Sequence, residues 1–77
     1  MTAPSYIQVQ ITFPTEESAN AVAEKLVAKR LAACAQILGP IKSVYTWKGK
    51  TEHSNELLLL AKTKAALFDL LVEAVRE

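Results

Sequence analysis

The chain has 77 residues, of which nine are basic, eight are acidic and 51% are hydrophobic, so its net charge is +1. Its charges are scattered, which excludes the basic patch typical of a nucleic-acid-binding protein and the charge clusters that bind anionic membranes. A domain of this size buries only about 60% of the surface of its unfolded chain. We therefore expect some of the abundant apolar surface to be covered between subunits.

The single cysteine cannot form a disulfide within the chain, and no apolar run approaches the ~20 residues of a membrane span. A charged-then-apolar leader segment is also not evident at the start of the sequence. These features predict a cytoplasmic protein that has no membrane partner.

Residues 6–13 alternate between apolar and polar side chains, which is typical of a half-buried strand. The apolar positions are Ile7, Val9, Ile11 and Phe13. Pro14 ends the pattern. Thr15 is expected to cap a helix over residues 16–30, because two glutamates follow it and three basic residues lie near the far end, as the helix dipole favours.

Residues 33–47 predict one long strand of β-branched, small and aromatic residues, interrupted by Gly39-Pro40. At ~3.3 Å per residue it would extend roughly 45 Å, whereas a domain this small is about 30 Å across. The outer half must therefore either curl back or reach onto another molecule, and we favour the second. We expect Tyr45, Trp47 and Val44 on this half to contact another copy of the chain.

The dipeptide Lys48-Gly49 predicts a turn, after which residues 50–63 return as a second long strand of a hairpin. The outer part of this strand is polar and residues 57–61 are continuously apolar, which indicates burial on both faces. Thr63 is expected to cap a second helix. The expected buried face of that helix consists of Leu67, Leu70, Leu71 and Ala74.

The order strand, helix, strand, strand, helix predicts an α+β fold, a ferredoxin-like two-layer sandwich with a long projecting hairpin. We expect residues 1–77 to form a single domain. A ferredoxin-like sandwich ends in a fourth strand after its second helix, and we expect that strand to be absent from these residues.

Four segments, PTEESA, KRLAACAQ, SVYTWKGK and LLLLAKT, occur in the order and at the separations found in the CutA divalent-cation tolerance family. The chain resembles this family over nearly its whole length from about Ile7. The resemblance implies a homotrimer of ferredoxin-like subunits, similar in architecture to the PII signalling proteins. It also implies a cytoplasmic role in tolerance of copper and other divalent cations.

The resemblance implies no resident cofactor except a copper ion or another divalent cation. Some relatives carry a cysteine late in the first strand, and Ile11 stands at the matching position here. Relatives also continue after the second helix into an H-P-Y-E segment, which is absent from these residues. The remaining candidate ligands are Cys34, His53, Glu56 and Glu52. Cys34 is alternatively a small buried residue, and His53 a solvated residue of the hairpin.

Other function classes stay open beside metal tolerance. A PII-like protein would bind a small metabolite, whereas a ferredoxin-like RNA-binding module would carry aromatic and basic residues on its central strands. An acylphosphatase-like hydrolase would need an arginine in the loop after the first strand, where Phe13-Pro14-Thr15 stands. No set of nucleophile, base and orienting group is evident, so we expect no enzyme activity.

Overall fold

Three strands form the sheet of the computed structural model, which describes residues 5–77. Strands β1 (Tyr6–Phe13), β2 (Cys34–Trp47) and β3 (Lys50–Lys64) lie in the order β1-β3-β2. Both outer strands are antiparallel to β3 and are therefore parallel to each other. This is the strand arrangement of a ferredoxin-like sandwich, so the predicted α+β fold is confirmed.

Helix α1 (Glu16–Ala28) connects β1 to β2, and a 3₁₀ turn, η1 (Ala65–Leu67), leads into helix α2 (Phe68–Arg76). Thr15 caps α1 as predicted, because its hydroxyl accepts a hydrogen bond of 3.1 Å from the backbone N–H of Ser18. Glu16 and Glu17 occupy the first turn, where the helix dipole stabilises negative charge.

Helix α1 ends at Ala28 and not at residue 30. The backbone N–H groups of Leu31 and Arg30 bond back to the carbonyls of Leu26 and Val27, at 2.9 and 3.0 Å, in the pattern of a Schellman motif. The motif needs a left-handed residue, and here that residue is Arg30, with a φ of 59°. A left-handed conformation costs a non-glycine residue about 1 kcal/mol or more.

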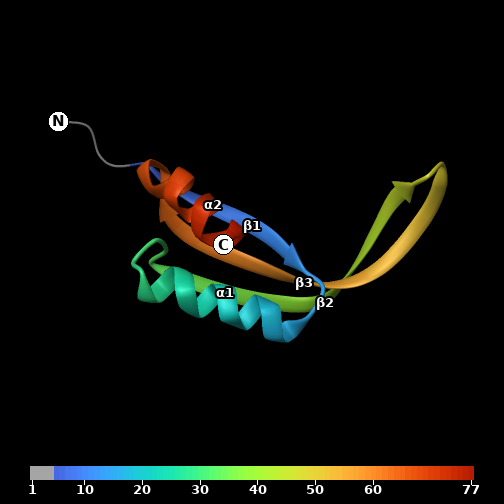
Figure 1. Ribbon diagram of the computed structural model, residues 1–77, viewed down its shortest axis with the longest axis horizontal. Coiled ribbons are helices and arrows are strands. Elements are labelled where there is room, and N and C mark those ends of the chain that lie inside the picture. The colour runs from blue at the N-terminus through green and yellow to red at the C-terminus, as the bar shows by residue number, and fades with distance from the viewer. Residues whose placement is uncertain (1–4) are drawn as a thin grey trace.

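The core lies between the helices and one face of the sheet, at the broad end of the molecule (Figure 1). Leu26 of α1, Leu59 of β3 and Leu71 of α2 are fully buried. The Lys25 amine joins the helices by donating a hydrogen bond of 2.7 Å to the backbone carbonyl of Ala74. In the apolar run of β3, Leu59 and Ala61 are buried against the helices, whereas Leu58 and Leu60 are half-buried on the opposite face, so within the described residues the predicted burial on both faces is seen on one face only.

The predicted start and inner face of the second helix were wrong in two respects. Thr63 does not cap a helix, because it stays paired with Ile7 in the sheet and its buried hydroxyl donates a hydrogen bond of 2.6 Å to the Leu31 carbonyl. Leu70 is 52% exposed, because the face of α2 that packs against the core is formed by Leu71, Ala74 and Val75, and Leu70 lies at the edge of that face. Leu71 and Ala74 are buried as expected.

The outer halves of β2 and β3 project from the body as a two-stranded arm (Figure 1). Strand β1 stops where Phe13 pairs with Leu57, so β3 residues 50–56 pair only with β2. The described chain measures 50 × 25 × 21 Å along its principal axes. The prediction that the hairpin is longer than the domain is wide is therefore confirmed.

A β-bulge at Gly39-Pro40 separates the arm from the body, as the sequence predicted. Leu38 pairs with Leu58 and Ile41 pairs with Glu56, so β2 uses one residue more than β3 between these pairs. Gly39 has a φ of +133°, and a Cβ there would lie 3.1 Å from the Glu56 carbonyl oxygen. Glycine therefore fits this position for both its backbone angle and its lack of a side chain.

Within residues 5–77, neither helix combines the length and the apolar character that crossing a membrane requires.

Candidate functional site

The arm carries the aromatic residues that the sequence predicted for a subunit contact. Trp47 is 61% exposed and Tyr45 is 46% exposed. They pair with Lys50 and Glu52 of β3, which places both on the sheet face opposite the helices, called the open face below. Val44 is also exposed, but it pairs with His53 and lies on the other face of the arm. The arm thus has apolar side chains on both faces, and the contact itself stays a prediction.

The turn at the tip of the arm holds this geometry. Lys48 and Gly49 both have positive φ, at 51° and 77°, as a two-residue hairpin turn requires. The Lys48 amine lies 5.9 Å from the centroid of the Trp47 ring, within the range of a cation–π contact. The turn therefore positions Trp47 at the end of the arm.

Glu56 lies on the open face where the arm leaves the body. Hydrogen bonds from the hydroxyls of Ser43, Thr12 and Ser54 lower the pKa of its carboxyl group below the ordinary value of 4.5. The Ser54 hydroxyl is 3.1 Å from Glu56 Oε1. These hydroxyls come from all three strands and surround the carboxylate where β1 ends and the arm begins.

This arrangement predicts acid sensitivity. A carboxylate with a lowered pKa in the folded state stabilises the protein above pH 4.5, and this stabilisation is lost as the pH falls through the folded-state value. We expect the free energy of unfolding to fall between about pH 5 and about pH 3, and to fall less in Glu56→Gln. Urea unfolding across this range measures the difference. Glu52→Gln, two positions away from Ser54 on β3, is the control, and an equal flattening in both variants would contradict a special role for Glu56.

The candidate metal ligands do not come together within one chain. Cys34 is exposed at the start of β2, so its alternative interpretation as a buried residue was wrong. It pairs with Lys62 on the open face, six β3 positions from Glu56, which corresponds to about 20 Å. His53 lies on the opposite face of the arm from Glu56 and Glu52. Among the described residues, no three His, Cys, Asp or Glu side chains form a cluster able to hold a metal.

Ile11 is a half-buried residue that packs against the core. It pairs with Leu59. Its side chain offers no donor atom, so β1 adds no ligand at this point.

Sequence reasoning missed two groups of residues. The hydroxyls around Glu56 are distant in the sequence, and the only local signal was the same-face spacing of Ser54 and Glu56. The other group comprises basic residues around a cavity at the broad end of the molecule, Arg30, Lys62 and Lys64. No spacing rule connects the end of a helix with the end of a strand.

Comparisons with known proteins agree with this geometry. Protein CutA of Mus musculus is 44% identical over 66 residues, which are 86% of this chain and 37% of the mouse protein. Divalent-cation tolerance protein CutA of Thermus thermophilus is 46% identical over 68 residues, which are 88% of this chain and 66% of that protein. The chain thus spans less than two thirds of the length of these curated relatives.

Solved structures show the same architecture. The divalent cation tolerance protein of Thermus thermophilus superposes with a TM-score of 0.88 at 44% identity, covering 92% of this chain and 69% of that one. CutA1 from Oryza sativa superposes with a TM-score of 0.90 at 40% identity, covering 97% and 68%. The model of the CutA1 divalent ion tolerance protein family matches residues 7–77. With its sheet order, projecting arm and sequence matched together, the chain belongs to the CutA1 divalent ion tolerance protein family.

Proposed function

We propose that this chain forms a homotrimer through its arm and serves in tolerance of divalent metal ions, holding copper or another cation at subunit boundaries. The family match over residues 7–77 is the observation that carries the proposal. The exposed aromatic residues of the arm support the assembly, since large apolar side chains on a two-stranded projection are costly in water until another chain covers them.

A trimer offers a route to metal affinity that one chain lacks. Three copies of a single ligand can converge around a threefold axis, so each chain needs to supply only one donor group. Cys34 is the candidate for a soft ion such as copper(I), because thiolate is a ligand that copper prefers and this side chain is accessible. His53 and Glu56 are the alternatives for a harder divalent ion.

Calorimetric titration of copper(I) into the wild-type protein and into Cys34→Ser tests this assignment. We expect Cys34→Ser to weaken copper binding at least about tenfold, because a hydroxyl replaces the only thiol of the chain. Binding should also strengthen with rising pH, since the metal displaces the thiol proton. Lys42→Gln, a change at an exposed residue that is not a candidate ligand, is the control. Equal copper affinity in Cys34→Ser and the wild type would remove Cys34 from the site.

We place this function in the cytoplasm, because a single unpaired cysteine fits a reducing compartment. Related proteins are named for other compartments, such as the chloroplastic CutA 1 of Oryza sativa and the periplasmic CutA of Archaeoglobus fulgidus.

The proposed role is one of binding and not of catalysis, since the described residues around Glu56 pair a carboxylate only with hydroxyls.

A further inference from the structure

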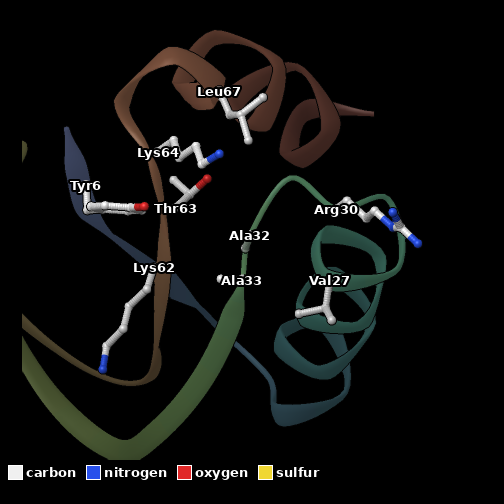
Figure 2. Close-up of a pocket in the computed structure, with 9 residues that line it drawn as sticks. All are labelled: Tyr6, Val27, Arg30, Ala32, Ala33, Lys62, Thr63, Lys64 and Leu67. Atoms are coloured by element: carbon white, nitrogen blue, oxygen red, sulfur yellow. The ribbon is translucent and has the colours of Figure 1, made fainter. Parts of the chain in front are cut away.

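A cavity of about 420 Å³ lies at the broad end of the molecule, remote from the arm (Figure 2). It is formed where the end of α1, the loop that leads into β2, the start of β1, the end of β3 and η1 meet. Its walls include Val27, Ala32, Ala33 and Leu67. Small-molecule sites in proteins typically have volumes of about 300–1,000 Å³ and predominantly apolar walls, so this cavity is of a size and character to hold a small ligand.

The charged residues that line the cavity are all basic, namely Arg30, Lys62 and Lys64. Within residues 5–77, the ion pairs join Glu77 to Lys25 and Lys29 and leave these three cations without a carboxylate partner. Figure 2 shows the charged ends of Arg30 and Lys62 extending away from the other labelled residues, so their aliphatic stems adjoin the cavity, whereas the amine of Lys64 points toward the other labelled residues. The cavity thus combines apolar walls with a lining whose charged residues are all basic.

Arg30 provides a second, independent observation. It occupies the left-handed position that ends α1, where glycine is the usual residue, and its φ is 59°. Unfavourable backbone conformations of this kind concentrate at functional sites. A glycine at this position would have no side chain. Arg30 instead brings a cationic side chain to the lining of the cavity.

We propose that this cavity binds a small amphipathic anion, with its apolar body against Val27, Ala32 and Leu67 and its acidic group near Lys64. Charge complementarity selects the anion, because the lining contains three cations and no Asp or Glu among the described residues. The limited volume selects a small molecule over a polymer. This site is remote from the arm, and although Cys34 neighbours its lining residues Ala33 and Lys62, the proposed ligand contacts do not use the thiol, so anion binding is tested independently of the proposed metal function.

Octanoate is a suitable probe. Octanamide has the same alkyl chain and an uncharged head group, so it serves as the neutral control ligand. Titration of the intact chain, followed by backbone amide NMR shifts, should show octanoate shifting Ala32, Ala33 and Leu67, with octanamide binding at least about threefold more weakly. Lys64→Gln should reduce the octanoate affinity at least about threefold and leave octanamide unchanged. Lys42→Gln, an exposed lysine on β2, is the matched control and should change neither affinity.

Arg30→Gly separates a binding role from a structural one. It removes the unfavourable backbone conformation and one cation, so it should raise the melting temperature while weakening octanoate binding. The proposal is overturned if octanoate and octanamide bind equally, or if Lys64→Gln and Arg30→Gly both keep the wild-type octanoate affinity. Shifts confined to Val44 and Trp47 would likewise overturn it, because they would place the probe on the arm.

Discussion

Replacing Trp47 by alanine should convert the assembled protein to monomers at micromolar concentration. Trp47 lies near the tip of the arm, is 61% exposed and shares the open face with Tyr45. Large aromatic residues in the centre of an interface commonly contribute about 2 kcal/mol or more each. Losing that contribution weakens a contact about thirtyfold, and each chain of a closed trimer takes part in two such contacts.

Sedimentation velocity measures this outcome directly. The wild type should sediment as a trimer, and Trp47→Ala as a folded monomer with unchanged far-UV circular dichroism. Trp47→Phe should retain much of the assembly, because it keeps an apolar ring. Phe68→Ala on α2 is the control, since Phe68 is also an exposed aromatic residue but lies away from the arm. A folded wild-type monomer, or a trimer that survives Trp47→Ala, would mean that the arm does not form the proposed contact.

Leu59→Ala should destabilise the chain by about 2–5 kcal/mol, the range for a buried leucine that leaves a cavity. Leu59 is fully buried in β3, where it pairs with Ile11 on one side and Ile37 on the other. Domains have about 5–15 kcal/mol of total stability, so this one change removes a large fraction of it.

Leu70→Ala is the matched control, because it deletes the same atoms from a leucine that is 52% exposed. We expect it to cost less than about 1 kcal/mol. Urea unfolding of both variants must use one protomer concentration, since assembly adds concentration-dependent stability. Equal losses in the two variants would show that Leu59 is not the central core residue that its burial indicates.

The strands and helices were predictable because their signals are local. The alternation of residues 6–13, the capping by Thr15 and the turn at Lys48-Gly49 depend on neighbouring side chains and backbone preferences. The order of these elements then predicted the fold, and the four segments shared with the CutA family indicated the family. The second helix was less predictable, because pairing with β1 kept Thr63 in the sheet and because packing against the core left Leu70 at the edge of the buried face.

The sequence by itself determined the order of the elements, the length of the hairpin and the position of its bend. Tertiary structure alone decided which side chains meet. The bulge at Gly39-Pro40 sets the face on which Tyr45 and Trp47 lie, and strand pairing gathers Thr12, Ser43 and Ser54 around Glu56. Packing of the helix end against the strand end likewise brings Arg30 and Lys64 to one cavity. Strand pairing keeps Cys34 apart from His53. The physical reason is that strand register and packing join residues distant in sequence, which local propensity does not encode.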